Sequence, residues 1–214
     1  MMLHLFLQTR LFLVFMLAVS FLSGCVMADT RSTRFYILNP LDSGASLVSE
    51  TNQEGSLSVE VASLRLPQYL ERPQIVTRSG GNRLELAEFH QWGGNLRKNI
   101  IRVLAKNLSQ LLATPNITIA PHRPPTPPDF RVELEVTQFE RDSGGQVRLS
   151  VQWHLSRGKD QKLLTTQITG LASPTVQTEP NFDKTVSAMS ALIGELSQII
   201  GREILDHIHG SLEP

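Results

Sequence analysis

Hydrophobic and polar residues alternate with a period of two in several stretches of the chain, which predicts strands with one buried face. The longest alternations occupy residues 130–136 and 147–155 and flank an Asp-Ser-Gly-Gly turn at 142–145, so they predict a hairpin. The alternation slips just before Phe139, which indicates a β-bulge. Shorter strands are expected at 34–38, 57–62, 74–78, 83–87, 117–120 and 162–170.

Two other stretches carry apolar residues three and four positions apart, which predicts amphipathic helices. The first follows Gly94 and ends at 114–116, and the second runs from about Asp183, which is placed to cap its first turn, to His209. The order strands, helix, strands, helix favours the α+β class. We therefore expect a single α+β domain over residues 34–210: a mostly antiparallel mixed sheet with two amphipathic helices packed on one face.

The first residues of the chain have the pattern of an export signal. A short segment carrying Arg10 precedes a mostly apolar run over 11–22. This run is shorter than the roughly 20 apolar residues that a membrane-spanning helix needs, but it has the length of a secretory signal. The alternative is an uncleaved signal anchor.

The residues that end this segment resemble a bacterial lipobox: Leu22, Ser23, Gly24 and Cys25. The small residues allow the backbone to enter a peptidase cleft, and the Cys25 sulfur can carry an S-diacylglycerol group. Cleavage then frees the Cys25 amine for an N-acyl chain such as palmitate. Cys25 is the only cysteine of the chain, and a stray buried cysteine is the alternative. We expect a lipoprotein signal peptide at 1–24 and a lipidated tether at 25–33.

Acylation of Cys25 would anchor the protein to a membrane. One buried acyl chain gives only marginal affinity for a bilayer, and stable attachment takes two signals, which three chains on Cys25 would exceed. Val26 follows, where an aspartate would resemble the inner-membrane retention signal of enteric bacteria. The sequence therefore favours the outer membrane, with the polypeptide in the periplasm.

Composition excludes several classes of protein. Twenty basic and twenty acidic residues balance, so the basic excess of a general nucleic-acid binder is missing. A single cysteine excludes an intrachain disulfide framework and a cysteine-based zinc ribbon. The sequence has no nucleophile elbow, Walker A, dinucleotide-binding or zincin motif. We expect no enzyme activity, no cofactor and no metal site.

Two pairs of residues have more than one interpretation. Tyr69 and Leu70 lie between prolines, where they could form an exposed interface anchor or fold back on the following hairpin. Glu203 and His207 are four apart on the last helix. They could make a polar contact with a neighbouring subunit or partner, or they could reach water from a frayed last turn.

Several strings of the chain are those of a known family. They are Phe35-Tyr36-Ile37-Leu38, Val59 with Val61, Leu66-Pro67-Gln68-Tyr69-Leu70, residues 72–78, Trp92 and the hairpin over 129–153. On these residues the chain resembles the ABC-type transport auxiliary lipoproteins, the PqiC-like lipoproteins encoded beside MCE-type lipid transport systems. It departs at Gly93-Gly94-Asn95, where family members more often carry small, acidic and proline residues.

The resemblance implies an outer-membrane lipoprotein that acts as periplasmic partner of an MCE-domain protein and its inner-membrane complex. Such systems move lipid or other hydrophobic compounds between membranes, and the auxiliary lipoprotein is expected to form a homo-oligomeric ring that docks on the MCE channel. Tyr69, Leu70 and Trp92 are the candidate interface residues. The alternative function is that of another cell-envelope scaffold or assembly lipoprotein, and a periplasmic hydrolase is a third hypothesis.

Overall fold

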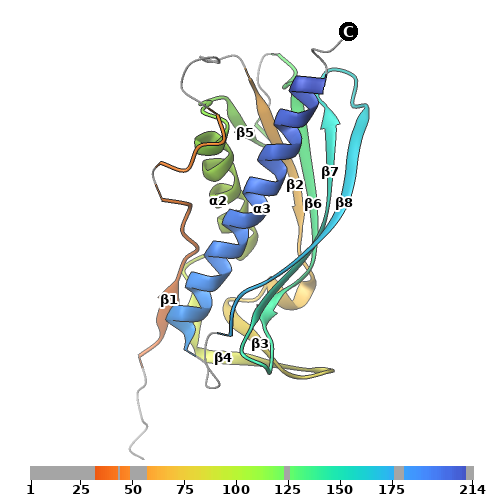
Figure 1. The fold of residues 1–214 in the computed structure, drawn as a ribbon. Helices are drawn as coiled ribbons and strands as arrows, with labels where there is room; N and C mark the ends of the chain where they lie inside the picture. The colour runs from red at the N-terminus through yellow and green to blue at the C-terminus, as the bar shows by residue number, and fades with distance from the viewer. Residues whose placement is uncertain (1–31, 43, 49–56, 123–125, 176–180, 211–214) are drawn as a thin grey trace, which may run out of the picture. The chain divides into compact units, whose positions relative to one another are not determined.

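The computed structural model describes residues 32–42, 44–48, 57–122, 126–175 and 181–210. These residues form one mixed sheet, one 3₁₀ turn and two helices (Figure 1). In chain order the elements are β1 (Arg34–Tyr36), β2 (Val59–Arg65), η1 (Gln68–Leu70), β3 (Gln74–Gly80), β4 (Arg83–Trp92), α2 (Leu96–Leu111), β5 (Ile117–Ile119), β6 (Phe130–Arg141), β7 (Val147–Arg157), β8 (Leu163–Ala172) and α3 (Phe182–Gly210).

The predicted hairpin is the longest pairing in the sheet. Strands β6 and β7 pair antiparallel from Phe130 opposite Arg157 to Arg141 opposite Val147, and β8 continues the antiparallel order on β7. The pairing shifts register between Val136 and Gln138, which confirms the predicted bulge. Antiparallel ladders thus supply the long pairings of the sheet.

The other edge of β6 is shared by two strands. Strand β2 pairs with its first half in parallel, as far as Arg65 opposite Glu135, and β3 pairs near its end, with Thr77 opposite Arg141. Strand β5 extends the sheet from β2, whereas β4 and then β1 extend it from β3. The sheet therefore divides into two branches at β6.

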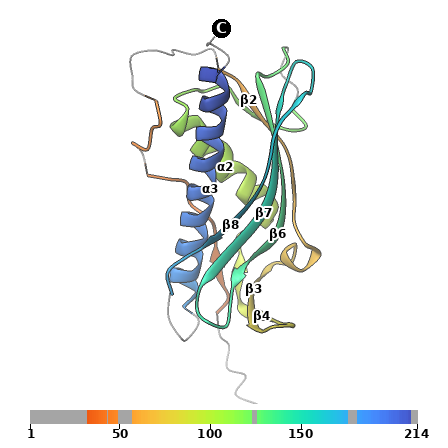
Figure 2. The same cartoon turned by 45° about the vertical axis from the view of Figure 1, so that its right-hand side comes forward.

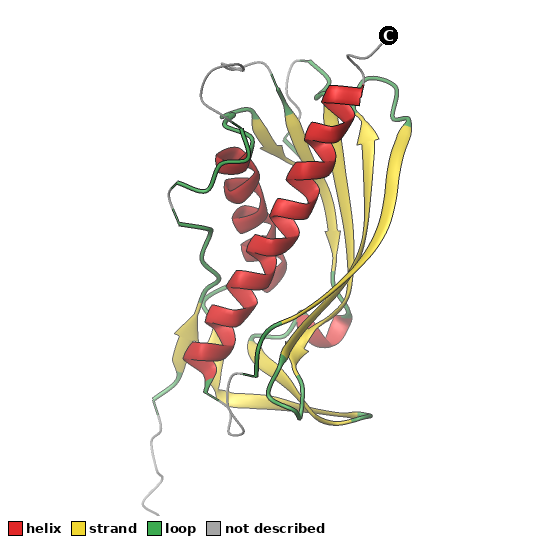
Figure 3. Ribbon diagram, in the orientation of Figure 1, coloured by secondary structure: helices red, strands yellow, loops and turns green. Residues whose placement is uncertain are grey.

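Both helices cover one face of this sheet, as expected (Figures 2 and 3). Helix α2 packs against β2 and β5, and α3 packs against β6, β7 and β8. The alternating residues of β7 that face the helices are at most 1% exposed, and they are Val147, Leu149, Val151, Trp153 and Leu155. Each such large apolar side chain stabilises the fold by roughly 1.5–3 kcal/mol relative to an exposed position.

Asparagine side chains begin both helices. Asn95 Oδ1 accepts a hydrogen bond from the Lys98 N–H at 3.0 Å, and Asn181 Oδ1 accepts one from the Lys184 N–H at 3.0 Å. The expectation that Asp183 caps the last helix is therefore wrong, because α3 begins one residue earlier and Asn181 takes that position.

The segment after β1, part of which was predicted as a loop, lies along the two helices. We call residues 37–42 and 44–48 the strap. Its backbone bonds to side chains of α2: the Leu38 N–H donates to Asn99 Oδ1 at 2.7 Å, and the Leu41 N–H donates to Asn107 Oδ1 at 2.8 Å. These bonds give the extended backbone the partners that a sheet would otherwise provide.

Two glycines of α3 make room for leucines of the strap. A Cβ on Gly194 would lie 2.6 Å from Leu41 Cδ2, and a Cβ on Gly201 would lie 3.0 Å from Leu47 Cδ1. The Leu47 N–H also donates to the carbonyl of Leu111 at 2.9 Å. The strap therefore packs closer to α3 than a helix with larger side chains would allow.

A third glycine sets a close approach beside the β7–β8 turn. The Gly158 N–H donates to the carbonyl of Asp129 at 2.9 Å, and a Cβ on Gly158 would lie 1.8 Å from the carbonyl oxygen of Pro128. The obstructing atom belongs to backbone, so it cannot rotate away as a side chain would. This contact joins the turn to the start of β6.

We predict that Gly158→Ala lowers the free energy of unfolding by about 2 kcal/mol or more, because the new methyl group forces two backbone segments apart. The matched control is Gly170→Ala on β8, where a Cβ would meet nothing within 4 Å. Urea denaturation of the chain that lacks residues 1–24 and carries Cys25→Ser measures both variants. Equal stability of the two would contradict the predicted clash.

Candidate functional site

The expected anchor and tether lie outside the described residues, apart from the end of the tether. Cys25 and the predicted signal peptide are therefore assessed from sequence alone. Within the described part of the chain, no helix combines the length and apolar character needed to cross a membrane. The same part holds no group of three or more His, Cys, Asp or Glu side chains arranged to bind a metal ion.

The candidate interface residues are largely buried within the domain. Leu70 is 3% exposed and Trp92 is 5% exposed. Tyr69 is half buried, and its hydroxyl donates to Glu140 Oε2 at 2.8 Å. The loop thus folds back on the sheet, as the second alternative for Tyr69 and Leu70 expected. A contact between this loop and another protein stays a prediction.

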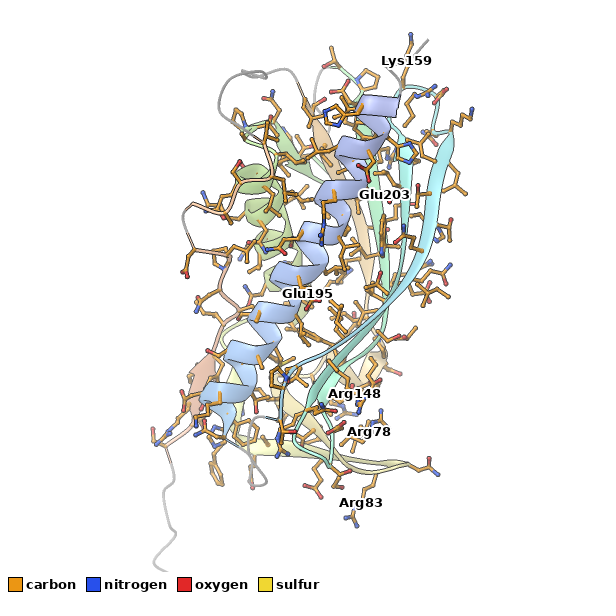
Figure 4. The ribbon with its side chains drawn as sticks, in the orientation of Figure 1. Arg78, Arg83, Arg148, Lys159, Glu195 and Glu203 are labelled. Carbon is orange, nitrogen blue, oxygen red and sulfur yellow. The ribbon has the colours of Figure 1, made fainter. Side chains whose placement is uncertain are left out.

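Glu140, to which Tyr69 donates, is a fully buried carboxylate. Its Oε1 accepts from Arg78 Nε at 2.9 Å and lies 2.8 Å from Arg78 Nη2, and it also accepts from Gln138 Nε2 at 3.1 Å. Its Oε2 accepts from the Tyr69 hydroxyl and from the Phe139 N–H at 3.1 Å. The cluster joins η1, β3 and β6, and Figure 4 labels Arg78 at this end of the sheet.

The chemistry of this cluster is that of a structural ion pair. Burial, followed by the hydrogen bond to Glu140, raises the pKa of Tyr69. The hydrogen bond to Glu140 also raises the pKa of Arg78. Both carboxylate oxygens already accept two or more hydrogen bonds, so Glu140 offers no free base to a substrate. Sequence reasoning missed Glu140, and the only signal for it was the break in alternation beside Phe139.

Glu203 and His207 contact β8. The Thr165 hydroxyl donates to Glu203 Oε1 at 2.6 Å and lies 2.9 Å from His207 Nε2, while Gln167 Nε2 donates to Glu203 Oε2 at 3.2 Å. The interpretation of a frayed last turn is wrong, because β8 holds both side chains and α3 continues to Gly210. Figure 4 labels Glu203 on α3.

His90 forms a third polar contact, between β1, β4 and α3. Its Nδ1 lies 2.8 Å from the Tyr36 hydroxyl, and its ring stacks on Phe182 with centroids 4.0 Å apart and an interplanar angle of 19°. Burial lowers the pKa of His90; Arg34 acts in the same direction and Asp183 opposes it. The edge strand β1 is thus fastened to α3 through aromatic rings.

These observations define an α+β scaffold in which the polar clusters around Glu140, Glu203 and His90 are bound within the domain. Residues 36–201 match the family model of the ABC-type transport auxiliary lipoprotein component, and the chain belongs to that family. This confirms the resemblance drawn from the sequence.

Two solved structures have folds similar to that of this chain. The crystal structure of an uncharacterized protein superposes with a TM-score of 0.64 at 19% identity, covering 81% of this chain and 99% of the other. A Xanthomonas campestris protein of family DUF330 superposes with a TM-score of 0.63 at 13% identity, covering 85% and 98%. At these identities the likeness shows the fold. A search among curated proteins gives no match to this chain.

We predict that Glu140→Gln lowers the free energy of unfolding by about 3 kcal/mol, because it removes the negative charge that pairs with Arg78 and replaces one acceptor oxygen of a fully buried group by an amide donor that faces other donors. The matched control is Glu135→Gln, which removes the partner of Arg65 at 2.9 Å in a pair whose side chains are 75% and 51% exposed. That change should cost less than about 1 kcal/mol. Denaturant unfolding compares the two, and similar losses would contradict the assigned role of Glu140.

We predict that His90 contributes to acid sensitivity. The pKa of His90 is lowered in the folded chain and is about 6.5 when unfolded. Below about pH 6.5 the unfolded chain therefore takes up a proton that the folded chain resists, and stability falls as the pH falls. His90→Gln should lose less stability than the wild type between pH 7.5 and pH 5. If the difference in unfolding free energy between the wild type and His90→Gln stays the same across that range, this contribution is excluded.

Proposed function

We propose that this chain is an outer-membrane lipoprotein that serves as the periplasmic auxiliary component of an MCE/ABC-type transport system for lipid or another hydrophobic compound. The family match over 36–201 carries the proposal, because it gives the transport-auxiliary role of a lipoprotein. The lipobox ending at Cys25 supports the lipid anchor, and Val26 supports sorting to the outer membrane.

The proposed mechanism is mechanical. Acyl chains on Cys25 would hold the domain close to the bilayer, since only residues 26–33 separate that cysteine from β1. The domain surface would then receive the periplasmic end of an MCE-domain protein bound to its inner-membrane complex. Assembly of several copies into a ring belongs to the same proposal, because a ring could continue the transporter's channel.

We further propose that the protein is not an enzyme, and the contacts of His207 support this. Thr165, His207 and Glu203 include a hydroxyl, an imidazole and a carboxylate, the groups of a hydrolytic relay. In such a relay the carboxylate holds one imidazole nitrogen while the hydroxyl faces the other. Here the Thr165 hydroxyl and Glu203 Oε1 both lie at His207 Nε2, at 2.9 and 3.4 Å, and the hydroxyl donates to the carboxylate.

We predict that replacing Cys25 by Ala releases the protein from the membrane or leaves it as a precursor, because the replacement removes the sulfur that takes the diacylglycerol. The wild type should fractionate with the outer membrane and, when captured from detergent-solubilised envelopes, bring with it an MCE-domain protein and its inner-membrane permease and ATPase. Quantitative mass spectrometry of the captured proteins makes the measurement.

The control is Ser23→Ala, which keeps a small residue before the cysteine and should behave as the wild type. Retention of Cys25→Ala in outer membranes after alkaline washing, at the length of the processed protein, would overturn the lipid anchor. Capture of other envelope proteins without an MCE-domain protein would overturn the transport role while leaving the anchor in place.

A further inference from the structure

Two large apolar side chains are exposed together where the domain begins. Phe35 on β1 is 66% exposed and Ile37, just after it, is 60% exposed, whereas Tyr36 between them is only 9% exposed. Because side chains alternate along an extended chain, Phe35 and Ile37 share the face that points away from the buried Tyr36. Exposed apolar residues that adjoin one another mark an interaction surface more often than single ones do.

Cations of α2 lie beside this pair. Ile37, Lys98 and Arg102 line the same cavity, at the start of the helix. Lys98 and Arg102 are exposed and one turn apart, so they project on the same side of α2. The sequence of α2 contains four lysines and arginines but no aspartate or glutamate, so this helix contributes only positive charge. The surface around Ile37 thus combines apolar side chains with cations.

The length of the connecting chain determines what this surface can reach. Residues 26–33 separate Cys25 from Arg34, and an extended chain of that length spans at most about 30 Å. An acylated Cys25 therefore keeps Arg34 within that distance of the bilayer, and Ile37, three residues further on, within about 40 Å. Tethering at this range raises the effective concentration of the membrane surface around the domain.

We propose that Phe35, Ile37, Lys98 and Arg102 form a docking surface for the anionic phospholipid bilayer that anchors Cys25. The inference rests on the proposed lipid anchor and adds a second attachment, which would hold the domain in one orientation. The apolar side chains enter the headgroup region, and the two cations meet lipid phosphates, as in proteins that bind membranes at the interface. The positive charge of α2 and the short tether favour a bilayer over a second copy of this chain.

The test places a single reporter on the docking surface. Because Cys25 is the only cysteine and its sulfur would be blocked by the diacylglycerol thioether, Phe35→Cys creates the only free thiol in the lipidated protein. A polarity-sensitive fluorophore is attached there, and the protein is reconstituted into phosphatidylcholine vesicles with and without phosphatidylglycerol. The matched control is Ile168→Cys on β8, an apolar position that is 77% exposed at a different edge of the sheet.

With phosphatidylglycerol, the fluorophore at position 35 should shift to the blue and become protected from acrylamide, a neutral quencher in the water. The fluorophore at position 168 should remain accessible to acrylamide in both kinds of vesicle. Lys98→Gln and Arg102→Gln should each lower the ratio of docked to undocked protein by about fivefold, the equivalent of about 1 kcal/mol per basic residue near an anionic surface.

Three results would overturn the docking surface. Equal quenching at positions 35 and 168, with the acyl chains detected by intact mass, would remove the surface but leave the proposed function in place. Protection at position 35 that follows protein density and ignores phosphatidylglycerol would identify a second copy as the occupant. An intact mass without acyl chains would overturn the anchor, and the docking surface with it.

Discussion

Strand β6 pairs with β7 along one edge, and each position along its other edge can hydrogen-bond to one strand only. The fold depends on how β2 and β3 divide that second edge. The change from one strand to the other falls between Glu135 and Arg141, a stretch that includes the bulge after Val136. Glu140 is buried just beyond this bulge and binds Arg78 on β3 and Tyr69 in η1. An unpaired charge there would be costly, so η1, β3 and β6 keep their positions together. Strand β3 carries β4 and β1, and through them the exposed Phe35 depends on the same pair of charges.

The strap fixes the branch of the sheet formed by β3, β4 and β1 to the helices. Asn107 is fully buried, and both ends of its amide are used: Oδ1 accepts from the Leu41 N–H and Nδ2 donates to Ser197 Oγ at 3.0 Å. A shift of the strap along α2 would leave this amide unsatisfied in the interior, which costs more than the bond itself contributes. The strap therefore has one register, and the position of β1 follows from it.

The sequence predicts the parts of this fold that depend on neighbouring residues. The hairpin of β6 and β7, its bulge and both helices follow from local periodicity and turn residues. The strap and the Glu140 cluster do not, because their partners lie about 60 to 70 residues away along the chain. The frayed last turn, one of the two alternatives for Glu203 and His207, is wrong for the same reason, since an isolated helix pattern says nothing about Thr165 on the neighbouring strand. For Tyr69 and Leu70 the sequence offered two alternatives; the hydrogen bond to Glu140 supports the folded-back one, and a contact with another protein stays a prediction.

The polar groups described above also bear on where recognition can occur. The hydrogen bonds of Glu140 and Asn107, both fully buried, are directed inward, and the partly buried Glu203 contacts β8. A partner that bound through them would first have to break these contacts, and a buried group that loses its partner costs about 1–3 kcal/mol or more. Exposed side chains can contact a partner without breaking these hydrogen bonds. On β1 those side chains stand directly after the segment that joins the domain to Cys25, so the proposed attachment and the proposed docking surface would meet at the same end of the folded chain.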